Sequence, residues 1–187
     1  TFDDSYTEIG YNSFYNCSSL IELNLGKNIV SIDNRAFYNC SSLTTVVVPE
    51  SVEIIGYESF YTEFNLGSSL ESITLPFIGK TREDLENNYF AYIFGSVYQI
   101  PESLKEIIIT DCKDIPENAF YNCSNVIKIV FPSDVTSIGE KAFGDCRSLT
   151  EIIIPDTVTS IGKNAFSGCS QLESITLPFV GSKPNTS

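Results

Sequence analysis

The residues of this sequence best suited to chemistry are cysteines, which recur in near-copies of one segment. "SFYNCSSL" at 13–20, "AFYNCSSL" at 36–43 and "AFYNCSNV" at 119–126 each place a cysteine between Asn and Ser. Such a thiol could be a nucleophile, a metal ligand or half of a disulfide, and the triplet matches the N-glycosylation pattern. The cysteines at this repeat position are Cys17, Cys40, Cys123, Cys146 and Cys169, and Cys112 stands apart.

Catalysis has little support in the composition. The sequence contains no histidine, which removes Ser/His/Asp and Cys/His nucleophile sets and histidine general bases. No pair of carboxylates stands in a pocket-forming motif. We therefore expect no enzyme, assign no catalytic residue, and expect no cofactor.

The spacing of the cysteines favours packing over metal or disulfide chemistry. Zinc ligands usually come in pairs about two to four residues apart, whereas these cysteines are 23 residues apart, or 83 between Cys40 and Cys123. Side chains stacked in successive coils point the same way, which makes disulfide geometry hard to reach. Buried cysteine packs as a small apolar residue with a poorly reactive thiol.

The Asn of the same triplet has a structural interpretation as well. Asn16, Asn39 and Asn122 would end a helical turn, where Asn is well tolerated, and the following Ser would bind backbone. Sugars on adjacent repeat positions would crowd one another. We therefore favour the structural interpretation over glycosylation for these three, and "NTS" at 185–187 is a fourth match to the pattern.

One repeat accounts for most of the chain. A Phe recurs at intervals of 23, 23, 60, 23 and 23 residues, at Phe14, Phe37, Phe60, Phe120, Phe143 and Phe166. A Leu or Val closes each copy, followed by an alternation of apolar residues and then usually Pro, as in "LTEIIIP" at 149–155. Period-two alternation over β-branched residues predicts a strand buried on one face, and Pro ends it.

Between the strands, each repeat carries a second apolar pair stopped by Gly and then an Ala-Phe-x-x-Cys segment. "VTSIG" at 135–139 and 158–162 predicts a short second strand. The Ala, Phe and Cys fall within the spacing of one helical turn. Because a unit of this length cannot bury its own apolar face, it must stack on its neighbours. We predict an α/β fold: a right-handed leucine-rich-repeat solenoid with a parallel concave sheet of about seven strands, short convex strands and helical turns.

The pattern "SIGxxAFxxCxSLxxIxIPxxV" resembles the BspA-like (Treponema-type) leucine-rich repeats of bacterial and trichomonad surface proteins. The resemblance covers about 8–79 and 101–180. It implies a secreted or surface-anchored protein that binds host or matrix proteins or other cells, and it implies no catalytic residues.

Two coils depart from the regular length. The repeated Leu at 43, 70 and 104 shows intervals of 27 and 34 residues, which predicts enlarged coils near 60–70 and 77–103. We expect a single solenoid over 1–180 and a tail at 181–187 that begins a further coil or is disordered. The chain opens on the polar segment "TFDDSYTEIG", so a signal peptide and anchor are expected outside it.

Net charge and hydropathy restrict the partners. The net charge is −13, from 24 acidic and 11 basic residues, without a basic cluster, so we expect no nucleic-acid partner. No apolar run approaches the roughly 18 residues that span a bilayer, so no direct membrane insertion is expected in this segment.

The outward positions of the predicted strands are the candidate contact residues, because a solenoid presents this face to partners. One column contains Glu22, Glu106, Lys128 and Glu151, and its acidic members favour basic partners. The next column carries an apolar stripe, Val47, Ile108, Val130 and Ile153, which marks an interface or merely reflects the strand preference of β-branched residues.

The second enlarged coil is rich in aromatic residues over 89–98. These residues either close over the coil as local packing or offer contacts to a ligand, with Tyr92 and Phe94 as candidates for the latter. The function we expect is a non-catalytic, adhesin-like binding module that recognises protein or glycoprotein through the concave sheet. The alternative is a structural spacer within a larger surface protein, with no ligand of its own.

Overall fold

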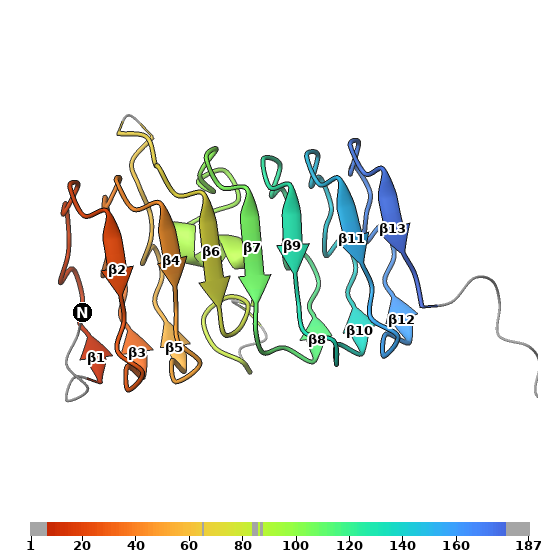
Figure 1. The fold of residues 1–187 in the computed structure, drawn as a ribbon, viewed down its shortest axis with the longest axis horizontal. Coiled ribbons are helices and arrows are strands. Elements are labelled where there is room, and N and C mark those ends of the chain that lie inside the picture. The colour runs from red at the N-terminus through yellow and green to blue at the C-terminus, as the bar shows by residue number, and fades with distance from the viewer. Residues whose placement is uncertain (1–6, 65, 84–85, 87, 179–187) are drawn as a thin grey trace, which may run out of the picture.

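The structure is a computed structural model, and it describes residues 7–64, 66–83, 86 and 88–178. Successive coils stack side by side along the long axis of the molecule, with one longer strand of each facing the viewer in Figure 1. These are β2 (Glu22–Asn24), β4 (Thr45–Val47), β6 (Ser72–Leu75), β7 (Glu106–Ile109), β9 (Lys128–Val130), β11 (Glu151–Ile153) and β13 (Ser174–Thr176). The number of these strands agrees with the prediction of about seven coils.

Shorter strands line the lower edge of the view in Figure 1. They are β1 (Glu8–Ile9), β3 (Ser31–Ile32), β5 (Ile54–Ile55), β8 (Asp114–Ile115), β10 (Ser137–Ile138) and β12 (Ser160–Ile161). They pair in parallel as β1-β3-β5 and β8-β10-β12. Each copy of "SIG" or "IIG" from 52 to 162 supplies one of these strands, as the sequence predicts.

The longer strands pair in parallel in the orders β2-β4-β6-β7-β9 and β11-β13. Their register places Ile73 opposite both Val46 and Ile107. This stacks equivalent residues of successive repeats, and the inward members are buried. In the last coil, the inward Ile175 and Leu177 are exposed because no described coil covers them.

The expected helical turns and the α/β character are not confirmed. Among the described residues the only helix is the 3₁₀ helix η1 (Phe90–Phe94), and no α-helix is present. The Ala-Phe-x-x-Cys segments instead form consecutive turns with positive φ every fourth residue, for example 57° at Arg35 and 59° at Asn39. A left-handed residue at that interval interrupts a right-handed helix after each turn.

These turns direct backbone groups along the solenoid axis rather than around a helix. Phe37 N donates to Ser59 O of the next coil at 2.8 Å, and Asn39 N donates to Tyr61 O at 2.7 Å. The same pair of bonds recurs from Phe120 to Ala142 and from Asn122 to Gly144, each at 2.7–2.8 Å. Adjacent coils are therefore hydrogen-bonded through their turns as well as through their strands, which satisfies backbone groups that a buried turn would otherwise orphan.

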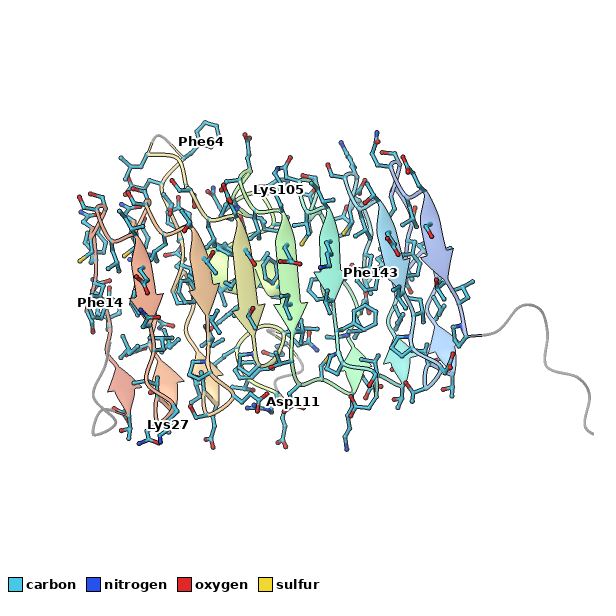
Figure 2. The ribbon with its side chains drawn as sticks, viewed as in Figure 1. Phe14, Lys27, Phe64, Lys105, Asp111 and Phe143 are labelled. Carbon is cyan, nitrogen blue, oxygen red and sulfur yellow. The ribbon has the colours of Figure 1, made fainter. Side chains whose placement is uncertain are left out.

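The repeated Phe side chains stack through the interior. Ring centroids lie 5.1 Å apart for Phe14 and Phe37 and 5.0 Å apart for Phe143 and Phe166. Figure 2 shows Phe143 inside the stack. In the enlarged coil, Phe90 of η1 lies 6.0 Å from Phe120, and its N–H donates to Ala119 O at 2.7 Å. Phe90 therefore takes the place of the repeated Phe in a coil whose sequence lacks that motif.

The rest of η1 is also core. Tyr92 and Phe94 are both buried, and the Tyr57 and Tyr92 rings meet edge to face at 5.5 Å. The hypothesis that Tyr92 and Phe94 contact a partner is therefore corrected, because the aromatic-rich segment fills the wider coil. The physical reason is that η1 lies inside the stack, where its large side chains pack at the normal density of a protein interior.

The second enlargement leaves the main sheet intact but interrupts the shorter one. β6 and β7 are separated by a long insertion, yet they pair along four residues. On the other side, Arg82 bridges the break between β5 and β8: its guanidinium donates to Val52 O at 3.1 Å, to Glu50 O at 3.0 Å and to Asp111 Oδ2 at 2.9 Å. The expected tail at 181–187, with Asn185, lies outside the described residues.

Candidate functional site

The face of the sheet formed by the longer strands carries the side chains that point away from the core. Glu22, Lys128 and Glu151 are exposed on it, and Glu106 is half-buried. Lys128 Nζ lies 2.7 Å from Glu106 Oε1, so the pair partly cancels in charge. Glu22 accepts a hydrogen bond from Asn24 Nδ2 at 2.5 Å. The surface is acidic at both ends of this row.

The apolar stripe lies one row further along the strands. The pairing register aligns Val47, Thr74, Ile108 and Val130 across four neighbouring strands, and Ile153 follows on β11. Val47, Val130 and Ile153 are exposed, with Ile153 reaching 62%. Ile108 is half-buried. The stripe thus reaches the surface at its two ends and recedes near its middle.

A depression of about 480 Å³ lies over β9 and β11. The two strands are neighbours (Figure 1), but they belong to separate hydrogen-bonded ladders among the described residues. Ile127, Val130 and Ile153 give the depression apolar walls, with Lys128 and Glu151 beside them. Ile127 was not among the sequence-predicted contacts, because it precedes the strand and its orientation does not follow from alternation.

The thiols lie in the stack as packing groups. Cys40 Sγ donates to Phe14 O at 3.2 Å, and Cys146 Sγ donates to Phe120 O at the same distance. Burial raises the pKa of the Cys40 thiol to about 12, and the Cys17 thiol nearby adds to the effect. All six cysteines are free; Cys17, in the first coil, is exposed. The burial and the sulfur–carbonyl contacts of these thiols support the packing interpretation.

The repeated asparagines occupy backbone positions with positive φ. Asn16, Asn39 and Asn122 have φ of 59°, 59° and 61°, a region that Asn tolerates better than most residues. The Asn39 side chain is buried, and its Oδ1 accepts a hydrogen bond from Glu63 N at 2.8 Å. An amide held in this way is not available to carry a glycan.

Neither a metal site nor a membrane-spanning helix is present among the described residues. They contain no group of three or more Cys, Asp and Glu side chains placed to hold a metal ion. In that same part of the chain, no helix has the length and apolar character needed to cross a bilayer.

Sequence reasoning did not single out the most exposed aromatic residues, although Tyr98 lies in the aromatic-rich segment 89–98. Phe64 and Tyr98 are 86% and 84% exposed, and both line a cleft between the two enlarged coils. Figure 2 shows Phe64 at the outer tip of its loop. The unequal repeat intervals marked both loops as irregular, but nothing in one dimension indicates that the loops meet.

Stacked coils with one parallel strand each, an in-register apolar interior and a sheet presented to one side define the chain as a leucine-rich-repeat solenoid. The chain belongs to the BspA-type leucine-rich-repeat family: the profile described as "BspA type Leucine rich repeat region" matches six copies over residues 1–95 and 91–183.

The chain is also similar to solved structures of bacterial repeat proteins. A leucine-rich-repeat protein of T. pallidum shares 29% identity over 80% of this chain and 53% of that chain, with a TM-score of 0.39. A leucine rich cell surface protein of Faecalibacterium prausnitzii shares 28% identity over 79% and 42%, with a TM-score of 0.46. A leucine-rich-repeat protein of Eubacterium ventriosum shares 16% identity over 99% and 44%, with a TM-score of 0.62, and it confirms the fold.

The chain spans about half the length of these three proteins or slightly less. No curated protein matches the sequence closely enough to count as a relative.

Proposed function

We propose that this chain is a non-catalytic binding module of a bacterial surface protein, and that it recognises a protein or glycoprotein through the concave face of the sheet. Membership of the BspA-type family supports a repeat module for binding. The surface location is supported by the F. prausnitzii relative, which is described as a cell surface protein. A host or matrix protein is the kind of partner that fits such a location.

The observation that carries the proposal is the exposed apolar stripe on a surface that is otherwise polar. Val47, Val130 and Ile153 stand out from a sheet whose core is complete without them. An apolar surface beside a depression is typical of interface centres, where a few desolvated contacts supply most of the affinity. Val130 and Ile153 line that depression, so we place the centre of the interface at β9 and β11.

Charge defines the type of partner. Glu22, Glu106 and Glu151 lie beside the apolar stripe, and the whole chain carries −13. Acidic groups around an apolar centre accelerate encounter with a basic surface and discourage an acidic one. Lys128 is tied to Glu106 and shields part of this field. The partner surface that fits best is apolar at its centre and basic at its rim.

The experiment is a binding screen against purified extracellular-matrix proteins, followed by substitution of the interface centre. The double variant Val130→Asp/Ile153→Asp should weaken binding to the selected partner by more than about tenfold, since each charge would have to be desolvated in the interface. Both side chains are exposed, so the unfolding temperature should stay close to that of the parent protein.

Ile54→Asp is the matched control, because Ile54 is also an exposed isoleucine of a short parallel strand but lies on β5, in the other sheet. It should leave binding unchanged. If the double variant binds as tightly as the parent protein, the concave face is the wrong site. If no matrix or surface protein binds this chain, the spacer alternative is correct and the proposal fails.

A further inference from the structure

The two enlarged coils meet at one edge of the solenoid. The loop before β6, described at 62–64 and 66–68, and the loop at 95–103 before β7 both lie at the upper edge of Figure 1. Between them is a cleft of about 270 Å³. At the same edge the regular coils have shorter turns, and the hollow there is a different one, lined by Asn125, Arg147 and Gln171 among others. The two enlargements of the repeat therefore line one cleft together.

The first loop adds little to the buried core. Phe64 and Leu66 are exposed, so the loop does not extend the core. The second insertion differs, since its earlier part buries Phe90 and Phe94 while its later part exposes Tyr98. Large exposed aromatic side chains are costly to keep in water, and loops that carry them commonly serve recognition. Phe64 and Tyr98 both line the cleft.

The repeat scaffold holds both loops in place. Asn39 Oδ1 accepts a hydrogen bond from Glu63 N at 2.8 Å, and Asn122 Nδ2 donates one to Val97 O at 3.1 Å. Ser103 Oγ donates to Leu70 O at 2.7 Å and closes the base of the loops. Repeat asparagines on either side of the enlarged coils thus fix the cleft before any ligand binds, and such preorganisation reduces the entropy cost of binding.

The lining combines aromatic faces with both kinds of hydrogen-bonding group. Glu63 and Glu102 supply carboxylate acceptors, and Gln99 supplies an amide that both donates and accepts. Thr62 adds a hydroxyl group. Sugars require this combination, because a pyranose ring packs its C–H face on an aromatic ring while its hydroxyls both donate and accept hydrogen bonds.

The charge of the cleft narrows the class of sugar. None of its described lining residues is basic, and two are carboxylates. A sialylated or sulfated glycan would bring further negative charge to a site of the same sign, on a chain that already carries −13. A cationic side chain would use the carboxylates and the rings, but it would have no use for the donors of Gln99 and Thr62.

We propose that the cleft between the loops before β6 and β7 binds neutral glycans, with Phe64 and Tyr98 stacking on the sugar and Glu63 and Glu102 accepting hydrogen bonds from its hydroxyls. This site is separate from the concave face at β9 and β11. It gives the chain a second recognition activity, which does not depend on the first.

The test is an array of neutral oligosaccharides built from mannose, galactose, glucose and N-acetylglucosamine, with sialylated and sulfated glycans and an oligolysine peptide alongside. The whole chain is displayed as a tetramer, since avidity makes weak single-site binding measurable. We expect retention of at least one neutral glycan and of none of the anionic ones. Phe64→Ala and Tyr98→Ala should each lower that binding by about tenfold or more.

Leu66→Ala is the matched control, because Leu66 is exposed on the same loop but does not line the cleft. It should bind as the parent chain does, and unfolding temperatures should be equal for all three variants. Absence of any neutral glycan from the bound set would overturn the proposal. So would glycan binding that survives both aromatic substitutions, or binding of oligolysine alone.

Discussion

The Nδ2 of Asn39 donates a hydrogen bond to Oδ1 of Asn16, one coil earlier, at 2.9 Å. The Oδ1 of Asn39 accepts one from Glu63 N, one coil later. A single buried amide therefore joins three consecutive coils, in a backbone conformation with positive φ that few other side chains tolerate. Asn39, the first residue of a triplet that matches the glycosylation pattern, therefore connects neighbouring repeats.

Asn39→Ala should destabilise the chain by about 2–3 kcal/mol, because two hydrogen bonds are lost and Glu63 N is left without its acceptor. Asn164→Ala is the control: Asn164 has the same positive φ of 57° but is exposed, so it reports the backbone cost alone. Urea unfolding of both variants measures the difference. Equal losses would mean that the side-chain bonds of Asn39 add nothing.

Gly139→Ala should destabilise the chain by about 1–3 kcal/mol through overpacking. A β-carbon at this position would lie 2.5 Å from Glu117 N and 2.6 Å from Pro116 C, atoms of the preceding coil that cannot move without shifting the stack. Glycine here is required by the close approach of two coils.

Gly10→Ala is the matched control for that substitution, since Gly10 holds the same repeat position in the first described coil. Its added β-carbon would meet only Ser13 Oγ, at 3.5 Å. We expect a change within about 0.5 kcal/mol, as for an ordinary surface substitution. If both glycines respond alike in urea unfolding, contact between coils is not the reason that residue 139 is glycine.

Ser59→Ala should stabilise the chain by about 1 kcal/mol. Ser59 is fully buried, and its hydroxyl has no hydrogen-bond partner in the part of the chain that the structure describes. A buried hydroxyl without a partner carries a desolvation cost that alanine removes. The equivalent residues in four other coils are alanines: Ala36, Ala119, Ala142 and Ala165.

Ser13→Ala tests the same change where the hydroxyl is bonded, because Ser13 Oγ donates to Gly10 O at 2.6 Å. Thermal unfolding should show a gain for Ser59→Ala and no gain for Ser13→Ala. A lower unfolding temperature for Ser59→Ala would indicate that its hydroxyl makes a stabilising contact after all.

The strands of the solenoid could be predicted from the sequence, because alternation and repetition are both patterns along the linear chain. The column expected on the outward face, such as Glu106 beside Lys128, is the register that the strands adopt. The turns did not follow, because the spacing of Ala, Phe and Cys fits a helix equally well. The positive φ that prevents a helix is shared by Arg35 and Lys141, whose types give no such signal.

The candidate site was likewise predictable from the sequence only in part. Val47, Val130 and Ile153 were predicted to be exposed from alternation alone, and they are. Whether Tyr92 is buried depends on how the enlarged coil packs, and no local sequence pattern indicates that packing. The cleft beside Phe64 required two loops of different coils to converge, and their separation in sequence conceals that contact.

Thiol labelling should divide the cysteines into fast and slow groups in the native chain. Cys17 is exposed and should react first, whereas Cys40, Cys123 and Cys146 are buried and should react only as the chain opens. Cys17→Ala should remove the fast phase, and labelling in denaturant should then reach the remaining five of the six thiols. Rapid labelling of most thiols in the native state would contradict the packing interpretation.

The same burial predicts a loss of stability at high pH. Burial raises the pKa of Cys40 and of Cys112 from 9.0 to about 12 in each case, and that of Cys169 to about 11. Between about pH 9 and pH 12, these thiols lose their protons in the unfolded chain but retain them in the folded chain. The contribution of these thiols to the free energy of unfolding is therefore fully present below about pH 9 and is lost as the pH rises toward 12. Unfolding in urea at successive pH values measures the slope.

Cys40→Ala should make that decline shallower, because it removes one thiol whose pKa is raised by folding. The variant should also be less stable than the parent chain at neutral pH, because a buried side chain is shortened. Tyr38 also has its pKa raised to about 12, by burial first and then by the neighbouring Tyr61, so part of the decline persists in every cysteine variant. A slope that is identical in the parent chain and in Cys40→Ala would show that the buried thiol does not couple folding to pH.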